Sequence, residues 1–233
     1  MIVAEHLTRS FPARRGKVTP VRNVSHAFPN GRVTYLLGLN GAGKSTLLRL
    51  ICGVLRPDVG AVFDSDDTPG MMLGSGAAHE RHTGRRHLYW VAAASGLPWE
   101  EADHTLHAVG LGHVLDSPIS GYSLGMRQRL GIATAILGAP RNIVLDEPFN
   151  GLDVAGVLWL RKLLRDLADR GHCVVVASHH LAEVERSGDE ALVLEGGSII
   201  ASGTVRQLRG THSSLEEALV ELIPRAAGGE VLP

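Results

Sequence analysis

Short apolar runs and longer amphipathic stretches follow one another along most of the chain. Val33–Leu37 and Val174–Ala177 contain only apolar, aromatic or β-branched residues. A strand buried on both faces has this pattern, because its successive side chains point to opposite sides of the sheet. We expect strands at Met1–Leu7, Val21–Phe28, Val33–Leu37, Ala61–Phe63, Asn142–Leu145, Val174–Ala177, Ala191–Leu194 and Ser198–Ala201.

Apolar residues at three- and four-residue spacing predict helices. We expect helices at Ser45–Cys52, His87–Ser95, Glu100–Val109, Leu124–Leu137, Val154–Ala168 and Ser214–Ile223, and turns at 14–17, 29–31 and 196–197. The helix at 154–168 lies between two apolar strands, as in a crossover that joins parallel strands. Residues from about 77 to 137 are mainly helical in pattern. The chain therefore predicts a mixed α/β core interrupted by a helical insert, with a frayed tail at 226–233.

Composition narrows the class of protein without choosing a function. Apolar residues make up 44% of the 233 residues and charged residues 20%, which is typical of a globular domain. The formal net charge of −1 gives no electrostatic reason to expect a nucleic-acid partner. Cys52 and Cys173 fit neither a metal nor a disulfide spacing, so we expect buried, reduced thiols.

The sequence shows no segment of its own that would enter a membrane. No apolar run approaches the ~20 residues of a membrane-spanning helix. The first ten residues lack the basic and apolar segments of a signal peptide. If the protein works at a membrane, we expect it to dock there through a partner.

Residues 38–46 read GLNGAGKST and contain the G-x-x-x-x-G-K-S pattern between an expected strand and an expected helix. Glycines let backbone N–H groups turn inward, and the start of the helix adds partial positive charge, so the loop predicts a phosphate site. Lys44 is expected to contact the β- and γ-phosphates and to assist catalysis, and the Ser45 hydroxyl to bind Mg²⁺. The candidate nucleotide-binding residues of this loop are Gly38, Asn40, Gly41, Ala42, Gly43, Lys44, Ser45 and Thr46.

Two carboxylates follow the apolar strand at 142–145 directly. Asp146 is expected to face the phosphate loop and to hold Mg²⁺ through water. Glu147 is expected to act as a general base on a water in line with the γ-phosphate. A strand that ends in Asp-Glu is a weak signal alone, because a solvated turn has the same composition. Its combination with the phosphate loop makes it a strong one.

Residues 122–129 read YSLGMRQR and resemble the signature motif of the ABC ATPase family, commonly Leu-Ser-Gly-Gly-Gln. Ser123 and Gly125 match that motif, and the other positions depart from it in a form that resembles export-type transporters. Ser123 can cap the following helix and Gly125 can expose backbone N–H groups, which makes a second anion site. The resemblance implies that Ser123, Gly125 and Met126 bind ATP held by a second subunit, in a head-to-tail dimer with two-fold symmetry. Taken alone, the segment also fits a plain amphipathic helix with a serine N-cap.

Further residues follow in the order of the family. Gly151-Leu152-Asp153 resembles the D-loop, which implies that Asp153 lies at the nucleotide beside the opposite subunit. Ser178-His179 resembles the switch-histidine motif, which implies that His179 bonds the γ-phosphate and orients water and Glu147. Phe11 stands where the family usually has an aromatic residue that stacks on adenine, although a lone aromatic is as often part of a core. The resemblance covers about residues 1–208.

One residue that the resemblance implies is missing. The family normally has a glutamine at the end of the strand before the helical insert, where it contacts Mg²⁺ and relays movement to the membrane subunit. The matching place lies near Gly74, and the two glutamines of the chain, Gln128 and Gln207, lie elsewhere. Glycine has no side chain to coordinate a metal, so we expect slower hydrolysis or an additional water on Mg²⁺. ATPase activity is still predicted, because the other catalytic residues are present.

The helical insert has two further features. It contains the histidines His79, His82, His87, His104 and His107. The last two are three residues apart on an expected helix, but no cysteine or carboxylate set completes a metal site, so we expect solvated histidines. The segment Trp90–Trp99 fits either a groove for a partner or the core of the insert.

The resemblance implies an α/β P-loop domain of the ABC ATPase type, with a mixed-sheet core, an N-terminal antiparallel β-subdomain and an inserted helical subdomain at about 75–138. We expect the ATPase domain to span 1–210 and a C-terminal helix and tail to span 211–233. The implied function is an ATP-hydrolysing subunit that uses ATP and Mg²⁺, forms a homodimer and powers transport through a separate transmembrane permease at the cytoplasmic face of the membrane. The segment SLGMRQR favours export of a drug, an antibiotic or a lipid-like compound.

Other classes of protein share some of these features. A soluble ABC ATPase of an assembly system, such as iron–sulfur cluster biogenesis, stays open, and co-purification with a membrane protein would separate it from a transporter. A translation-associated ABC protein carries two such domains in one chain, and a chromosome or DNA-repair type carries a long coiled-coil insert. A kinase is disfavoured by the segments at 123–128 and 178–179.

Overall fold

The computed structural model describes residues 1–14, 16–64, 68–74 and 78–222. Its elements in chain order are β1 (Ile2–Pro12), β2 (Lys17–Phe28), β3 (Arg32–Leu37), α1 (Lys44–Ile51), β4 (Val59–Asp64), β5 (Gly70–Leu73), α2 (Gly84–Ala94), α3 (Trp99–Ala108), a 3₁₀ turn (Ile119–Gly121), α4 (Leu124–Ile136), β6 (Asn142–Asp146), α5 (Val154–Asp169), β7 (Cys173–Ala177), α6 (Leu181–Ser187), β8 (Glu190–Glu195), β9 (Ser198–Thr204), α7 (Val205–Arg209) and α8 (Leu215–Leu222). The expected turn residue 15, the expected start of the helical insert at 75–77 and the expected frayed tail at 226–233 lie outside the described residues.

The strands form two sheets. Three strands pair in the antiparallel order β2-β1-β4, and six pair in the order β5-β6-β7-β3-β8-β9. Within the larger sheet the first five strands are parallel, and β9 runs antiparallel to β8. The mixed sheet and the antiparallel N-terminal sheet that the family resemblance implied are therefore confirmed.

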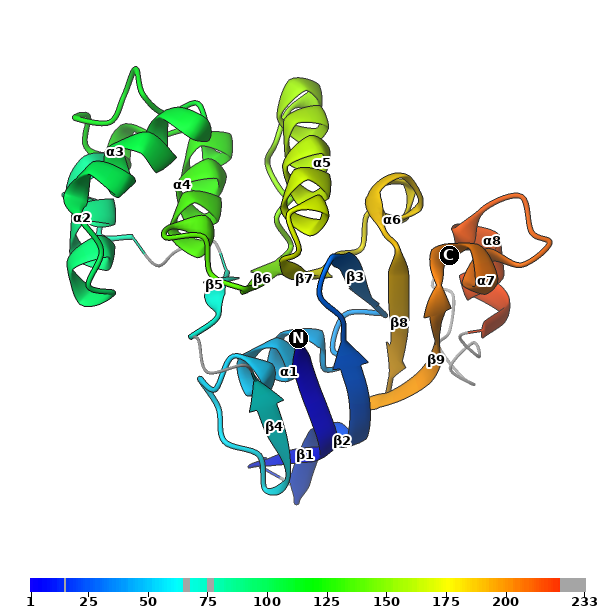
Figure 1. Cartoon of the computed structure of the whole chain (residues 1–233). Helices are drawn as coiled ribbons and strands as arrows, with labels where there is room; N and C mark the ends of the chain where they lie inside the picture. The colour runs from blue at the N-terminus through cyan, green and yellow to red at the C-terminus, as the bar shows by residue number, and fades with distance from the viewer. Residues whose placement is uncertain (15, 65–67, 75–77, 223–233) are drawn as a thin grey trace.

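The central strands are apolar at every position because both faces of the large sheet are covered. Leu145 and Val176 lie in one core with side chains of α4 and α5. Their neighbours Val144 and Val175 face the other side, where α1 and the antiparallel sheet complete a second core. Figure 1 shows α5 on one side of the large sheet and α1 with β1, β2 and β4 on the other. Because side chains alternate along each strand, the large sheet packs against a covering layer on each of its two faces.

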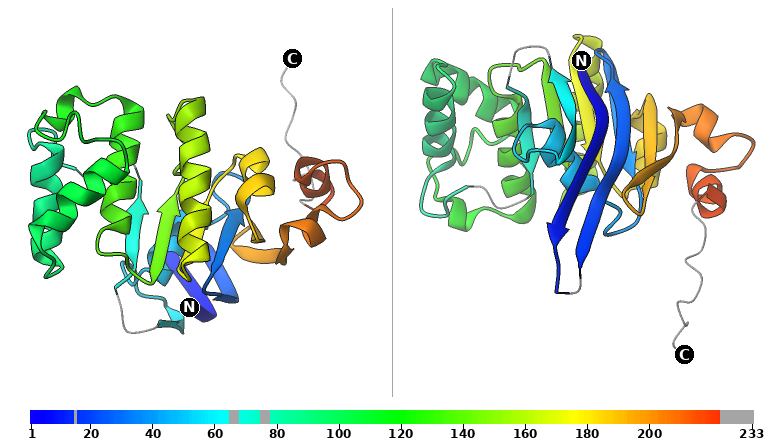
Figure 2. Two further views of the ribbon diagram at one scale, coloured as in Figure 1. Left: turned by 45° about the horizontal axis from the view of Figure 1, so that its top comes forward. Right: turned by 90° about the horizontal axis from the view of Figure 1, so that it is seen from below.

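The helices α2, α3 and α4 form a unit with its own core, at one end of the molecule (Figure 2). Leu88, Leu106 and Leu130, one from each helix, are fully or almost fully buried there. α2 begins at Gly84, three residues before the expected start, because the hydroxyl of Thr83 caps it by accepting a hydrogen bond from the Arg86 N–H. The expected helical insert between the strands of the large sheet is therefore present.

Two short helices, α6 and α7, were not expected from the sequence. Each is too short to show a periodic apolar pattern, although α7 begins with a capping box between Thr204 and Gln207. The expected tail helix is present as α8, and Leu215 and Leu219 on it pack into the same core as Val184 of α6. The proposed division of the chain at residue 210 stays a prediction.

The two cysteines and the hydropathy of the helices were also subjects of prediction. Cys52 and Cys173 are both buried, as predicted. Among the described residues, no helix combines the length and the hydropathy that crossing a membrane requires.

Candidate functional site

The carboxyl ends of three parallel strands meet at one edge of the large sheet. β3 leads into the phosphate loop, β6 ends at Asp146, and β7 ends at Ala177, directly before Ser178. In the register, Ala177 lies opposite both Leu36 and Asp146, so the three strand ends are neighbours. An open cleft of about 310 Å³ lies at this edge, and its lining residues are Pro20, Asn40, Gly41, Ala42, Gly43, Lys44, Ser45, Thr46, Asp146 and Glu147.

The phosphate loop is held against β2 of the antiparallel sheet. Gly43 is the N-cap residue of α1 and has φ 107°, in the left-handed region that favours glycine. A Cβ at this position would lie 1.9 Å from the carbonyl oxygen of Pro20, so a larger residue does not fit. This contact explains why Pro20, which the sequence motif does not include, lines the cleft.

The Lys44 ammonium is paired within its own loop. Its Nζ donates hydrogen bonds to the carbonyl oxygens of Gly38 at 2.7 Å and Leu39 at 3.2 Å. The residue is only 8% exposed. Gly38 itself does not line the cleft, although it was predicted to bind nucleotide, and it contributes here through its carbonyl oxygen. A phosphate oxygen that entered the loop would compete with these carbonyl groups for the ammonium protons.

Asp146 and Ser45 lie in hydrogen-bonding contact across the cleft. Burial raises the pKa of Asp146 above its ordinary value, the hydrogen bond from Ser45 opposes that shift, and the negative charge of Glu147 adds to it. A carboxylate beside a hydroxyl, both facing an open cleft, is a donor set of hard oxygen atoms. These two residues therefore fit a bound Mg²⁺ ion, which such oxygen ligands favour.

The side chains of Glu147 and His179 lie in contact. The His179 Nδ1 atom lies 2.9 Å from the Glu147 Oε2 atom. The neighbouring His180 ring lies 4.2 Å from that of His179, centroid to centroid, and its Nε2 lies 3.2 Å from Asn150 Oδ1. His180 was not predicted, and the only sequence signal for it was the His-His pair after an apolar strand.

The backbone of Glu147 has an unexpected partner in α4. The Gln128 Nε2 atom donates a hydrogen bond to the Glu147 carbonyl oxygen at 2.8 Å. Gln128 is only 2% exposed. It was not predicted as a site residue. Its signal was a polar residue four positions before Ile132 and seven before Ala135, on the buried face of the helix.

The residues of the signature segment do not line the cleft in the described part of the chain. Ser123 is the exposed N-cap residue of α4 and accepts a hydrogen bond from the Met126 N–H at 3.2 Å. Asp153 likewise caps α5, with its Oδ1 atom accepting from the Gly156 N–H at 2.7 Å. The two segments are adjacent, because Gly125 lies beside the carbonyl oxygen of Gly151. Their predicted role at a nucleotide requires a second copy of the chain and stays a prediction.

Phe11 also lies outside the residues that line the cleft. It pairs with Val18 near the hairpin end of β1 and β2, and the Arg9 guanidinium lies 5.0 Å from its ring centroid. The ring is partly exposed. Its predicted stacking on adenine stays a prediction.

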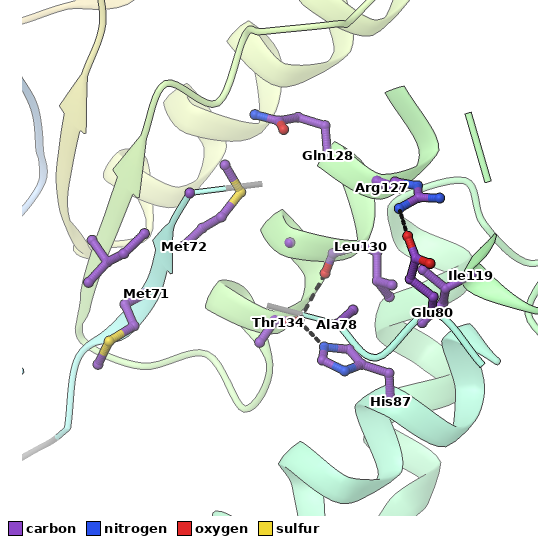
Figure 3. Close-up of a pocket in the computed structure, with 13 residues that line it drawn as sticks. Met71, Met72, Ala78, Glu80, His87, Ile119, Arg127, Gln128, Leu130 and Thr134 are labelled. Carbon is purple, nitrogen blue, oxygen red and sulfur yellow. Dashed lines mark hydrogen bonds and ion pairs between the residues drawn. The ribbon is translucent and has the colours of Figure 1, made fainter. Parts of the chain in front are cut away.

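Gly74 directly follows β5, whose last residue, Leu73, lies opposite Asp146. The position predicted from the resemblance is therefore at the same edge of the sheet as the candidate catalytic residues. Gly74 has φ 99°, and within the described part of the chain no heavy atom lies within 4 Å of the place where its Cβ would stand. It borders a cavity of about 150 Å³ between β5, α2 and α4, which Figure 3 shows with Met72, Gln128 and Thr134 among its lining residues.

The helical unit exposes both histidine and tryptophan side chains. His104 and His107 are exposed, as expected for solvated histidines. His87 departs from that expectation, because it is partly buried and its Nε2 atom lies 3.1 Å from the Thr134 hydroxyl oxygen. Trp90 and Trp99 each expose 63% of their surface, so they are not core residues of the insert. Exposed tryptophans favour the interpretation of this segment as a surface for a partner.

The sequence and the fold of the chain are similar to those of known proteins. Residues 21–150 match the sequence model of the family described as ABC transporter. The chain is 35% identical to the uncharacterized ABC transporter ATP-binding protein YdbJ of Bacillus subtilis, over 88% of this chain and 70% of the relative. It is 31% identical to the lantibiotic transport ATP-binding protein SrtF of Streptococcus pyogenes, over 86% of this chain and 89% of the relative. The fold also matches the ATP-binding cassette MJ0796, solved as a dimer in a post-hydrolysis state with ADP and Pi, with a TM-score of 0.80, 21% identity, and coverage of 88% and 98%.

Proposed function

The chain belongs to the ABC transporter family as its ATP-binding and ATP-hydrolysing subunit, and on that basis we propose how its residues bind and hydrolyse ATP. The observation that carries the proposal is the meeting of Lys44, Asp146 and Glu147 at one open cleft. A cation, a carboxylate that fits a metal ion and a candidate base are the groups that phosphoryl transfer to water needs.

The phosphate loop binds the triphosphate of ATP. Backbone N–H groups at 40–46 and the start of α1 attract its negative charge, and Lys44 exchanges its loop carbonyl partners for the β- and γ-phosphates. Ser45 and Asp146 are the residues that would hold Mg²⁺, which would neutralise charge on the phosphates. Asp146 would then be held in its ionised form, which would offset the cost of burying that carboxylate.

Glu147 acts as the general base. Its carboxylate accepts a proton from a water molecule placed in line with the γ-phosphate. His179 lies within hydrogen-bonding distance of that carboxylate, so it holds the carboxylate in position and offers its second ring nitrogen to the γ-phosphate. Lys44 stabilises the negative charge on the phosphate oxygens as the bond to the leaving group breaks.

A second copy of the chain completes each site. Ser123, Gly125, Met126 and Asp153 lie outside the cleft of their own chain, and Ser123 and Asp153 stand exposed at the start of helices. Free N–H groups at a helix start are an anion site. In a head-to-tail homodimer these residues reach the γ-phosphate bound by the other subunit. The dimeric state of the structural relative MJ0796 supports this arrangement.

The dimer works with a separate transmembrane permease, at the cytoplasmic face of the membrane. The exposed Trp90 and Trp99 on the helical unit provide a surface for that partner. ATP binding by both faces of the dimer favours the closed state, and hydrolysis releases it, which drives the permease. Two observations support export of a drug, an antibiotic or a lipid-like compound. The relative SrtF is a lantibiotic transport ATP-binding protein, and the segment SLGMRQR resembles export-type transporters.

A complementation experiment tests the shared site. Lys44→Ala disables the phosphate loop, and Ser123→Arg disables the signature segment; each variant alone is expected to lose ATPase activity. In a mixed head-to-tail dimer both defects fall in one site and the other site is intact, so mixing should restore about one quarter of the wild-type rate. No recovery in the mixture, from proteins that still associate by light scattering, would contradict sites made from two copies. A Glu147→Gln variant is expected to accumulate as an ATP-bound dimer in the same assay.

A further inference from the structure

Glu147 adopts a backbone conformation that its side chain does not favour. Its φ of 51° lies in the left-handed region, where residues with a Cβ are uncommon. Such a conformation persists only where the surroundings hold it. Its N–H donates to the Ala177 carbonyl oxygen at 2.9 Å, which ties it to β7. Its carbonyl oxygen accepts two hydrogen bonds, one from the Asn150 N–H at 3.3 Å and one from the Gln128 side chain at 2.8 Å.

In the described ranges, Gln128 has no second hydrogen-bond partner that would explain its burial. It is 2% exposed, and its Oε1 atom has no hydrogen-bond partner among the described residues. Burying a primary amide costs free energy that its hydrogen bonds must offset. In Gln128 the bond from Nε2 to the Glu147 carbonyl oxygen is the one that does so. An apolar side chain of the same length would fill the space without that cost.

We propose that Gln128 is a positioning residue, which couples α4 to the backbone of the general base. This inference rests on the proposed role of Glu147. Because Gln128 fixes the carbonyl group, it sets the orientation of the whole residue and so directs the carboxylate toward His179, 2.9 Å away. Gln128 belongs to the helix that Ser123 caps, so this amide transmits movement of the signature segment to the general base.

The surroundings make this link more important in this chain. Gly74, at the end of β5, has no side chain to connect the helical unit with the catalytic edge. Gln128 stands at the same cavity, between the helical unit and β5 (Figure 3), and reaches the catalytic edge with its amide. It therefore provides a side-chain connection at the place where glycine leaves none.

The test replaces the amide without changing the volume greatly. Gln128→Leu removes the donor, and Gln128→Met is a second variant that keeps the unbranched chain, for use if leucine prevents folding. The control is Thr134→Val on the same helix and the same cavity, which loses hydrogen bonds to the Leu130 carbonyl oxygen and to His87 but touches no part of Glu147. Thermal melting shows which variants fold, and the steady-state ATPase rate and ATP binding are measured for each.

A positioning role predicts a change in turnover and not in binding. For a Gln128 variant that melts cooperatively, kcat should fall about tenfold while the Kd for ATP stays within about twofold, and Thr134→Val should keep both values. In a Glu147→Gln background, removing the Gln128 amide should have no further effect on the residual rate. A folded Gln128 variant with wild-type kcat, or one with the same loss in the Glu147→Gln background, would overturn the proposal. Wild-type turnover by Glu147→Gln itself would instead refute the proposed base.

Discussion

The variant Gly74→Gln measures how much catalytic rate is lost because the glutamine is missing. Gly74→Ala is its matched control. Position 74 has φ 99°, so either side chain introduces backbone strain of about 1–2 kcal/mol. Among the residues that the structure describes, no heavy atom lies within 4 Å of the Cβ position, so the strain is not accompanied by a clash with them. For a chain of this size each kcal/mol corresponds to a fall in Tm of about 2–4 °C. Both variants should therefore melt about 2–8 °C below the wild-type protein, by similar amounts.

The two variants should differ in catalysis. Gly74 follows the residue that lies opposite Asp146, and neighbouring strands are about 4.8 Å apart, a distance that a glutamine side chain can span. An amide oxygen there can orient water or contact the metal at Asp146. We expect kcat for Gly74→Gln to exceed that of Gly74→Ala by about 3- to 10-fold, or about 0.7–1.4 kcal/mol of transition-state stabilisation.

Steady-state ATPase rates at saturating Mg-ATP, measured below both melting transitions, give this ratio directly. Comparison with alanine, and not with wild type, cancels the strain that the two variants share. Equal kcat values for the two variants would refute the reasoning. They would mean that the glycine costs nothing in catalysis, and that water or another residue already fills the place of the amide.

Three further predictions follow from the site. Asp146→Asn should abolish Mg²⁺-dependent hydrolysis and yet raise the Tm of the protein without nucleotide by about 1–3 °C at pH 8. Because burial raises the pKa of Asp146 above 3.8 in the folded state, its ionised form opposes folding as the pH rises through that window, so the gain in Tm should shrink as the pH is lowered toward about 4. Gly43→Ala should lose ATP binding and lower the Tm by several degrees, since its Cβ would lie 1.9 Å from the Pro20 carbonyl oxygen; nucleotide binding by calorimetry checks this, and unchanged affinity would contradict it. Trp90→Ala with Trp99→Ala should keep the ATPase rate of the isolated protein and weaken its recovery with membranes that contain the permease, and equal recovery would exclude this surface.

The parts of the fold that follow from local chemistry could be read from the sequence. The runs around Val144 and Val175 predict buried strands because both faces of the sheet are covered, and the phosphate loop has a residue pattern that few other turns require. The contact between Glu147 and His179 was predicted only from the family resemblance, because nothing local links residues 32 positions apart. The resemblance also implied the helical insert, whose own core the apolar spacing supports.

The residues that escaped prediction act through tertiary contacts. Pro20 reaches the cleft because the antiparallel sheet packs against the loop at Gly43, and no motif records that approach. Gln128 reads as an ordinary polar residue of a helix until α4 is packed against β6. α6 has seven residues and α7 has five, so neither completes two helical turns and their apolar residues show no period.

Three groups at the cleft have surroundings that bound Mg-ATP would change. The Glu147 backbone is strained, the Asp146 carboxylate is buried, and the Lys44 ammonium is bonded to carbonyl oxygens of its own loop. A Mg²⁺ ion held at Asp146 would favour the ionised carboxylate, and phosphate would offer Lys44 stronger, charged acceptors than the loop carbonyl groups. In the proposed function, part of the affinity for Mg-ATP would therefore come from these two changes within one chain. Since hydrolysis and release would return the cleft to its starting state, the free energy of binding would be available again in each cycle to close the proposed dimer.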